Sequence, residues 1–280
     1  MSRLQPGLCS VTFRRCSAAE IVELATRAGL RCIEWGGDVH VPHGDLRTAG
    51  EVARRTVDAG LEVCSYGSYL VADGAAAGSM GPVLDTAVAL GAPAVRVWAP
   101  PDGTADSLAE VADAAAELGL WVYLEFHGGT LTSSAPSAVS LLERVDAPNL
   151  LCAWQPPYWS PGGEPGALPR TAPGVAAIRM LGEQLAHLHV YAWSGDGTRH
   201  PLSRQRRSWT EWIRTAGDLD APEGFRRSVL IEFVEHDDPA NLRRDAAVLR
   251  EILAVVGDGP VGGTGARRPE ALRGAPPGSP

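Results

Sequence analysis

Four side chains that could bind a metal ion stand at the ends of short stretches in which apolar residues recur. They are Glu125, Gln155, His189 and Glu232. Two carboxylates, an imidazole and an amide oxygen together suit a divalent cation such as Mn²⁺, Mg²⁺, Co²⁺ or Zn²⁺. The set contains no thiolate, which argues against a structural zinc site. Buried carboxylates are costly without a cation or a hydrogen-bond partner, so the set favours one shared site over separate structural roles.

The alternation of residue types indicates that these side chains point into the interior of a barrel. Neighbouring side chains of a strand point to opposite faces, and in a barrel one face packs on the surrounding helices. The apolar neighbours of Glu125 and Glu232 define that outer face, which leaves both carboxylates inside. The first strand is ambiguous in this respect. The same alternation places a further polar or aromatic set inside: Glu34, Tyr66, Arg96, Trp98, His127 and His187.

The elements that carry these residues alternate along the chain as β-type and helical stretches, the pattern of βα units around a parallel sheet. Strands are predicted at Gly7–Phe13, Arg31–Gly36, Leu61–Tyr66, Ala94–Trp98, Trp121–His127, Asn149–Gln155, Leu185–Tyr191 and Ser228–Val234. Helices are predicted at Ala18–Ala28, Leu46–Ala59, Leu84–Leu90, Ser107–Leu118, Ser137–Val145, Gly174–Gln184, Ser208–Ala216 and Pro239–Val256. Glycine follows four of these helices, at 29, 60, 91 and 119, where a residue with positive φ commonly ends a helix.

We therefore expect one (β/α)8 TIM barrel over residues 1–256, with its active site at the C-terminal strand ends. Residues 257–280 are rich in Gly and Pro and predict a disordered tail. The stretch Pro156–Pro173 is long for a βα loop, and such loops often cover a site. The N-terminus lacks the pattern of a signal peptide, and no apolar run approaches the roughly 18 residues that cross a bilayer. We expect a soluble cytoplasmic protein without a membrane partner.

Composition excludes several classes of chemistry. The 280 residues carry a formal net charge of −8, which argues against nucleic acid as a partner. All 25 basic residues are arginine, so a protein Schiff base, lysine-anchored pyridoxal phosphate and a P-loop lysine are excluded. The five cysteines form an odd set without a Cys-x-x-Cys pair, which predicts free thiols, most of them in the core.

Three short motifs at successive strand ends carry a resemblance to a known family. They are LEFH at Leu124–His127, HLHV at His187–Val190 and IEF at Ile231–Phe233. In this order and spacing the sequence resembles the sugar phosphate isomerase/epimerase family of xylose isomerase-like barrels, over nearly the whole chain to about residue 256. That family also includes hydroxypyruvate isomerases, ketose 3-epimerases, inosose dehydratases and DNA-repair endonucleases.

The resemblance implies that Glu125, Gln155, His189 and Glu232 are the metal ligands. The departure is Gln155, because the family usually has Asp at this position. A neutral amide can coordinate through its oxygen, but losing a negative charge should weaken binding or change the preferred metal. Tyr158 stands where family members often have a substrate-binding His, so substrate contacts are expected to differ.

The paired glutamates of the family imply proton transfer beside a carbonyl, through an enediolate stabilised by the metal. We expect Glu125 and Glu232 to be the catalytic pair, acting on a small sugar or sugar-like compound. Arg96 is either an anion-binding residue or an internal partner of Glu34. Residues 35–45, WGGDVHVPHGD, either bind sugar hydroxyls or form a capped turn before the next helix. The predicted substrate-binding residues are Trp35, His40, Tyr66, Arg96, Trp98, His127, Tyr158 and His187.

Three alternatives follow from the same residues. A dehydratase or other lyase of the same barrel family, acting on an inosose or a dehydroshikimate-like acid, would use the same carboxylates. A barrel that binds a metabolite without turnover would account for Gln155. Metal-dependent cleavage of DNA would need more metal ligands and a basic surface, which the net charge of −8 argues against. The sequence carries no signal that decides between a monomer, a homodimer and a homotetramer.

Overall fold

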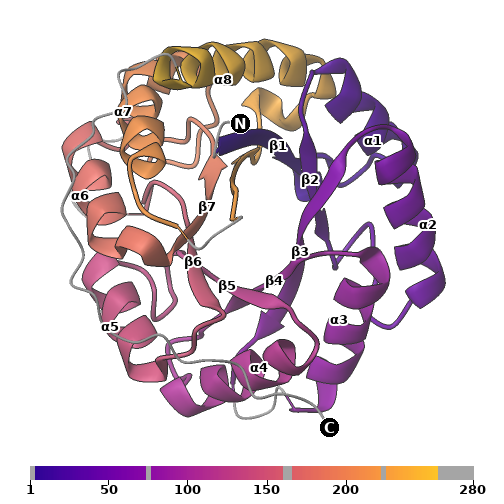
Figure 1. Ribbon diagram of the computed structural model, residues 1–280. Coiled ribbons are helices and arrows are strands. Elements are labelled where there is room, and N and C mark those ends of the chain that lie inside the picture. The colour runs from indigo at the N-terminus through magenta and orange to yellow at the C-terminus, as the bar shows by residue number, and fades with distance from the viewer. Residues whose placement is uncertain (1–3, 74–76, 160–165, 222–224, 258–280) are drawn as a thin grey trace, which may run out of the picture.

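The computed structural model describes residues 4–73, 77–159, 166–221 and 225–257. Within these residues, eight parallel strands follow one another around a closed barrel, and eight α-helices surround it (Figure 1). The predicted (β/α)8 barrel is confirmed. The predicted tail, apart from Gly257 at the end of the last helix, lies outside the described residues.

The strands are β1 Leu4–Cys9, β2 Cys32–Gly36, β3 Glu62–Val71, β4 Ala94–Trp98, β5 Trp121–Glu125, β6 Leu150–Trp154, β7 Leu185–Val190 and β8 Arg227–Ile231. The α-helices are α1 Ala18–Arg27, α2 Leu46–Asp58, α3 Ala77–Leu90, α4 Ala105–Glu117, α5 Ala135–Val145, α6 Thr171–Leu181, α7 Arg206–Gly217 and α8 Leu242–Gly257. Short 3₁₀ turns stand between some of them, and the one at Ser10–Phe13 directly follows β1.

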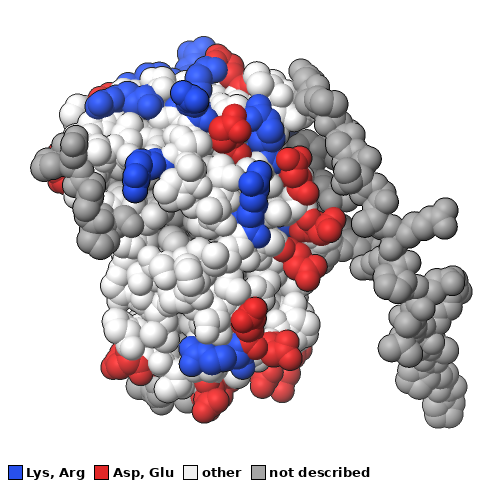
Figure 2. Space-filling model, turned by 90° about the vertical axis from the view of Figure 1, so that its left-hand side faces the viewer, with Lys and Arg blue, Asp and Glu red and all other residues white. Residues whose placement is uncertain are grey.

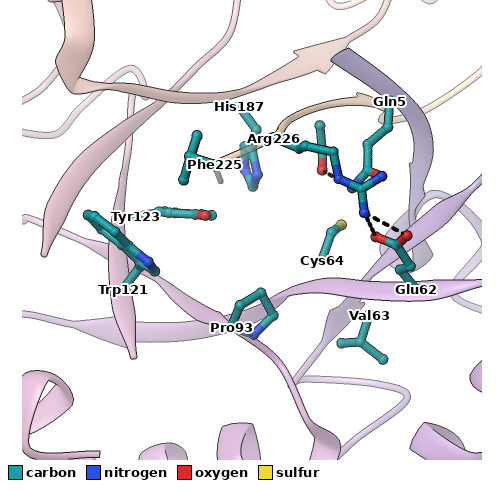
Figure 3. Close-up of a pocket in the computed structure, with 11 residues that line it drawn as sticks. Gln5, Glu62, Val63, Cys64, Pro93, Trp121, Tyr123, His187, Phe225 and Arg226 are labelled. Carbon is teal, nitrogen blue, oxygen red and sulfur yellow. Dashed lines mark hydrogen bonds and ion pairs between the residues drawn. The ribbon is translucent and has the colours of Figure 1, made fainter. Parts of the chain in front are cut away.

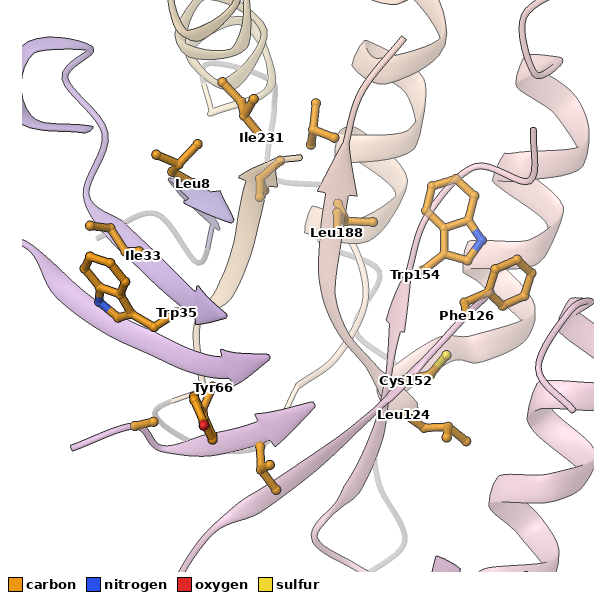
Figure 4. Packing of buried hydrophobic residues seen from close by; sticks show 14 of the residues in the cluster. Leu8, Ile33, Trp35, Tyr66, Leu124, Phe126, Cys152, Trp154, Leu188 and Ile231 are labelled. Carbon is orange, nitrogen blue, oxygen red and sulfur yellow. The ribbon is translucent and has the colours of Figure 1, made fainter. Parts of the chain in front are cut away.

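Most of the hydrophobic core lies between the strands and the helices. The outward side chains of the strands, among them Leu8, Ile33, Leu124, Trp154 and Leu188, are buried and pack in one cluster (Figure 4). Burying a side chain of this size contributes about 1.5–3 kcal/mol relative to leaving it exposed. Because the apolar side chains face outward, the interior of the barrel is left for the polar side chains of the same strands.

Local sequence signals set the helix ends. Gly29, Gly60, Gly91 and Gly119 follow α1 to α4 with φ between 68° and 75°, as the helix–glycine–strand pattern predicts. At the start of α1, Ser17 accepts from the backbone N–H of Glu20, whose carboxylate accepts from that of Ser17. This capping box satisfies donors that the first helical turn leaves open.

The first and third strand predictions need the largest corrections, while the fifth and eighth strands end earlier than predicted, at Glu125 and Ile231. The first strand ends at Cys9, and the predicted stretch to Phe13 forms a 3₁₀ turn instead. The third strand runs on to Val71, and its register shifts against β2 between Ile33 and Glu34. That shift reverses the alternation expected for β3. Ser65 therefore points into the barrel and Tyr66 points toward the helices, the opposite of the prediction for Tyr66.

The outer surface is mixed in charge. On the face that Figure 2 presents, arginine side chains stand among acidic ones and do not form a continuous basic patch. In the part of the chain that the structure describes, no helix combines the length and apolar character needed to cross a membrane.

Candidate active site

The polar side chains that the strands direct into the barrel, together with Trp98, fall into two neighbouring groups. The arginine cluster consists of Glu34, Arg96, Trp98, Glu125 and Gln155, which come from or directly follow β2, β4, β5 and β6. The histidine cluster consists of Cys9, His187, His189 and Glu232, which come from or directly follow β1, β7 and β8. Glu34 contacts both clusters, because its carboxylate also lies 3.5 and 3.6 Å from the Nε2 atoms of His187 and His189.

Arg96 is the centre of the arginine cluster. Its Nε donates to Glu34 Oε1 at 3.0 Å, and its Nη1 donates to Glu125 Oε2. All three side chains are buried, so the guanidinium neutralises charges that would be costly alone. Of the two roles predicted for Arg96, the internal ion pair with Glu34 is present.

Gly67 of β3 makes room for this ion pair. A Cβ atom at this position would lie 2.7 Å from Arg96 Nη2 and 3.1 Å from Glu34 Oε1. Next to it in the sequence, Ser68 Oγ donates to the backbone oxygen of Arg96 at 2.8 Å. A side chain at Gly67 would therefore displace the guanidinium.

Glu125 is held through one carboxylate oxygen. Its Oε2 accepts from both Arg96 and the indole N–H of Trp98. Its Oε1 has a weaker contact, from Gln155 Nε2 at 3.4 Å. The same amide nitrogen of Gln155 donates to the backbone oxygen of Phe126 at 2.8 Å. Glu125 thus has one fixed oxygen and one freer oxygen.

His189 is the centre of the histidine cluster. Its Nδ1 lies 3.2 Å from Glu232 Oε2, and its ring stacks on His187 with a centroid distance of 5.1 Å. His189 Nε2 is buried and has no hydrogen-bond partner among the described residues. Cys9, buried and at the end of β1, lies 3.7 Å from Glu34 through its sulfur. The ligand atoms of Cys9, His189 and Glu232 all lie within 4.8 Å of one another.

The charge states of these groups follow from their partners. Burial alone would raise the pKa of Glu34, but Arg96, and after it His189 and His187, hold that pKa well below the usual range. Burial also opposes ionisation of Glu232, yet His189 lowers the pKa of this carboxyl. Burial lowers the pKa of His187 to about 3, so its imidazole is neutral. Burial raises the pKa of the Cys9 thiol to about 12.

The backbone directly after Glu232 has an unusual conformation. Phe233 has a φ of 62°, a left-handed conformation that non-glycine residues seldom adopt. Thr12 holds the backbone on both sides of Glu232, because its hydroxyl donates to Ile231 O at 3.3 Å and accepts from Phe233 N–H at 3.0 Å. The conformation of this segment fixes the direction in which Glu232 leaves the strand.

Stacked rings form two groups beyond the strand ends. His127 lies between Trp98 and Trp159, with centroid distances of 4.6 and 5.5 Å and interplanar angles of 27° in both pairs. Tyr158 stacks on Trp193 at 4.4 Å. We call the first group, Trp98, His127 and Trp159, the aromatic wall. It stands beside Glu125, because Trp98 donates to that carboxylate.

Other predicted substrate-binding residues lie elsewhere. Trp35 is buried on the helix-facing side of β2, where its indole N–H donates to Thr56 of α2 (Figure 4 shows its position). The Tyr66 hydroxyl, also on the helix side, donates to Val41 O at 2.7 Å. His40 bonds to Ser10 Oγ and Cys16 O, both at 3.0 Å. The structure does not bring these three into contact with either cluster.

His187 extends toward the opposite end of the barrel. It lines a cavity of about 330 Å³ at the N-terminal strand ends, together with Gln5, Cys64, Tyr123 and Ser228 (Figure 3). An ion pair between Glu62 and Arg226 stands at this cavity. His187 thus faces the cavity while its Nε2 faces Glu34.

The stretch after β2 forms a capped turn before α2. The Asp45 side chain accepts from the backbone N–H of Thr48 at 3.0 Å, which caps the N-terminus of that helix. Of the two interpretations of residues 35–45, the capped turn is therefore the one that the structure shows.

Sequence reasoning missed several residues that reach the site. Cys9 escaped because the alternation of the first strand is ambiguous, and Ser65 because the shift in β3 cannot be read from that strand alone. Tyr69, whose ring lies 5.4 Å from the Arg96 guanidinium, was outside the predicted strand. Arg199 lies over the rings of Trp193 and Phe233 and pairs with Asp237. Its loop position gave no periodic signal.

A closed eight-stranded barrel with a buried polar group at its C-terminal strand ends has the architecture of a (β/α)8 enzyme. The chain belongs to the xylose isomerase-like TIM barrel family, whose sequence pattern matches residues 22–252.

Solved structures agree with this fold. The probable 3-DHS dehydratase AsbF from Bacillus anthracis, involved in petrobactin synthesis, has a TM-score of 0.71 and 22% identity, over 88% of this chain and 98% of that chain. A xylose isomerase domain protein from Alicyclobacillus acidocaldarius has a TM-score of 0.68 and 17% identity, over 91% and 99%.

A xylose isomerase-like TIM barrel protein from Mycobacterium smegmatis, solved in complex with magnesium, has a TM-score of 0.62 and 13% identity, over 90% of this chain and 97% of that chain. At these identities the likenesses establish the fold. No curated protein matches the sequence.

Proposed function

We propose that the protein is a divalent-metal-dependent isomerase or epimerase that moves a proton next to the carbonyl of a small polyhydroxylated compound. The observation that carries this proposal is the gathering of three buried carboxylates, two imidazoles and one guanidinium inside the barrel. The carboxylates are Glu34, Glu125 and Glu232. Membership of a family that is mostly enzymatic and binds small sugar-like metabolites supports it.

The donor atoms of the histidine cluster fit a divalent cation. His189 Nε2 is buried and has no hydrogen-bond partner among the described residues. Glu232 lies beside the same imidazole ring. Imidazole nitrogen and carboxylate oxygen are ligands of Mn²⁺, Co²⁺ and Zn²⁺. His189 and Glu232 would hold the ion, and Glu125 and Gln155 remain predicted ligands. When bound, such an ion supplies Lewis-acid polarisation of a carbonyl oxygen.

Glu125 is suited to remove the proton. Arg96 and Trp98 fix its Oε2, while Oε1 is restrained only by the 3.4 Å contact from Gln155. A general base needs a positioned carboxylate with one oxygen available to the substrate, and the geometry of Glu125 meets that requirement. Glu232 is the second proton-transfer group, oriented by His189.

The aromatic wall would bind the less polar faces of the substrate. Its rings are only partly buried, so they border space that solvent reaches. Apolar and aromatic surfaces with a few polar groups are typical of small-molecule sites, and they exclude water from the reacting carbon. Tyr158 and Trp193 extend this surface on the other side of Trp159, because Tyr158 contacts both rings.

Solvent deuterium exchange tests the reaction. The full chain, loaded with Zn²⁺, Co²⁺, Mn²⁺ or Mg²⁺ in turn, is incubated in D₂O with ketoses, inososes and dehydroshikimate-like acids. Label at the carbon next to the carbonyl is expected for one of these classes. A product inverted at that carbon indicates epimerisation, a shifted carbonyl indicates isomerisation, and loss of water indicates the dehydratase alternative.

Two variants identify the proton-transfer groups. Glu125→Gln and Glu232→Gln should each lower the exchange rate about 10²- to 10⁴-fold, the usual contribution of a positioned acid or base. Glu62→Gln, an exposed carboxylate at the opposite end of the barrel, is the matched control and should keep the rate. Unchanged exchange in both active-site variants would contradict the mechanism.

A further inference from the structure

We propose that Cys9 is a metal ligand, so that the metal-binding set is Cys9, His189 and Glu232 instead of the four strand-end residues predicted from the sequence. This inference rests on the proposed function only in that both need a divalent ion at this end of the barrel. It changes which side of the site holds the ion and which metals the site prefers.

Barrel closure brings the three residues together. Cys9 ends β1, His189 lies in β7 and Glu232 follows β8, and β1 pairs with β8 to close the sheet. Cys9 is also the register partner of Glu34 in β2, so both side chains occupy the inner face. All three candidate ligands are buried, and their ligand atoms lie within 4.8 Å of one another. A small movement of these side chains would bring their atoms to the bonding distances of one ion.

Two of the sequence-predicted ligands have other partners. Glu125 already accepts from Arg96 and Trp98, and Gln155 presents its amide nitrogen to Glu125 and Phe126 O. In the described residues, two groups of three side chains could hold a metal ion, Cys9, His189 and Glu232 and also Glu34, His187 and His189, and Glu125 belongs to neither. An ion bound by Glu125 would lie beside the Arg96 guanidinium, whose positive charge opposes a second cation there.

The distribution of charge also favours the histidine side. Three buried carboxylates face one buried guanidinium. Arg96 bonds directly to Glu34 and Glu125, and Glu232 is left with His189 as its direct partner. A cation beside Glu232 would lie between carboxylate and imidazole groups, whereas a cation beside Glu125 would lie next to the guanidinium.

The donor set specifies the metal. A thiolate, an imidazole and a carboxylate are typical of Zn²⁺ and of its substitute Co²⁺, whereas Mg²⁺ takes oxygen ligands. Three protein ligands are also the usual number for a catalytic zinc, which keeps a position for water or substrate. We therefore expect Zn²⁺ to bind at least about 100-fold more tightly than Mg²⁺, a difference that follows from ligand softness.

Cobalt substitution tests the sulfur ligand directly. The full chain is stripped of metal with a chelator and titrated with Co²⁺, and the near-ultraviolet absorption is recorded. A sulfur-to-cobalt charge-transfer band should appear and disappear when Zn²⁺ is added. This measurement needs no substrate and no variant, so it shows whether a cysteine is a ligand even if a Cys9 variant fails to fold.

Matched variants then locate the ligands. Cys9→Ser should abolish the band and weaken Zn²⁺ binding by at least about 100-fold, the upper end of what loss of a supporting contact costs. Cys152→Ser is the control, because Cys152 is equally buried but faces the helices. Glu125→Gln should keep Zn²⁺ affinity within a few-fold.

Two results would overturn the inference. The first is bound Co²⁺ without a sulfur band, together with loss of affinity in Glu125→Gln and not in Cys9→Ser; the proposed reaction would then stand with the sequence-predicted ligands. The second is no binding of Zn²⁺ or Co²⁺ by the wild-type chain. In contrast, a Cys9-dependent band without deuterium exchange in any sugar would refute the proposed reaction and leave the metal set intact.

Discussion

The two clusters of the site differ in where their positive charge comes from. In the arginine cluster, Arg96 compensates Glu34 and Glu125 and is bonded to both. In the histidine cluster, Glu232 pairs with a histidine, and the Nε2 atom of His189 has no hydrogen-bond partner among the described residues. One half of the barrel end is held by a guanidinium, which always keeps its charge, and the other half by a histidine, whose nitrogen can bind either a proton or a metal ion.

Under the proposed function, this difference places the fixed base Glu125 in one cluster and metal binding in the other, where Glu232 would both bind the ion and transfer a proton. A carboxylate held by a guanidinium keeps a constant position whether or not metal is bound, which suits a residue that must transfer a proton. A cysteine, a histidine and a glutamate without a permanent cation can exchange a metal. The ligand set predicted from the sequence, with all four strand-end residues on one ion, does not require this division.

The largest effect is expected when the guanidinium of the arginine cluster is removed. Arg96→Met should lower the free energy of unfolding by about 3–5 kcal/mol, because it leaves two buried carboxylates without their partner. Urea denaturation of the metal-free protein measures this. The double variant Arg96→Met, Glu125→Gln should recover part of the loss. A loss below about 1 kcal/mol would mean that the ion pair is not needed to hold the cluster together.

Zinc binding at the histidine cluster should stabilise the folded protein. Zn²⁺ at 100 times its dissociation constant should raise the free energy of unfolding by about 2.7 kcal/mol, since it binds the folded chain. In Cys9→Ser the same zinc concentration should give little stabilisation, whereas Arg96→Met should keep the gain. Thermal unfolding with and without zinc provides the measurement, and equal gains in wild type and Cys9→Ser would contradict the division.

Acid should lower the free energy of unfolding through His40, which lies near Cys9. Burial lowers the pKa of His40 from its usual 6.5, and His40 bonds to Ser10, the neighbour of Cys9. Below about pH 6.5 the unfolded chain therefore binds a proton that the folded chain does not. Stability should fall with falling pH by up to about 1.4 kcal/mol per pH unit from this group, until the lowered pKa is reached.

His40→Gln should reduce that slope in urea denaturation between pH 7 and 5 by its own share, while His187, whose pKa burial lowers to about 3, keeps contributing to it. His43→Gln, an exposed histidine of the same turn, is the control. An unchanged slope in the His40 variant would assign the acid sensitivity to another group.

The smallest expected effect concerns the backbone around Glu232. Thr12→Val removes the hydroxyl that bonds on both sides of this residue and should cost about 1 kcal/mol. Because Glu232 would lose its fixed direction, zinc affinity should fall while the arginine cluster stays intact. Zinc titration of the variant measures this, and an unchanged affinity would show that Thr12 serves stability alone.

Much of the fold followed from the sequence because its signals are local. Apolar alternation marked most strands, and glycine after the helices marked the returns to the sheet. The inward direction of Glu125, His189 and Arg96 needed only the strand period. Tyr66 was misplaced because a register shift between neighbouring strands reverses the alternation, and such a shift depends on a partner far away in the chain.

The division of the site could not be predicted for a similar reason. Cys9 and Glu232 lie at opposite ends of the sequence, and only barrel closure makes them neighbours. The bond from Arg96 to Glu125 depends on side-chain reach across the interior and on the absence of a Cβ at Gly67. Residue type and strand period contain neither piece of information.

The positions of the tryptophans predict how intrinsic fluorescence responds to a bound ligand. Trp154 of β6 and the α7 residues Trp209 and Trp212 are fully buried and pack against one another between the barrel and that helix. Their emission should therefore stay constant when a ligand binds. Trp98 and Trp159 are partly exposed on either side of His127. Occupancy of the barrel mouth should therefore appear as a change in intrinsic fluorescence over a fixed background, and candidate compounds can be screened without a label.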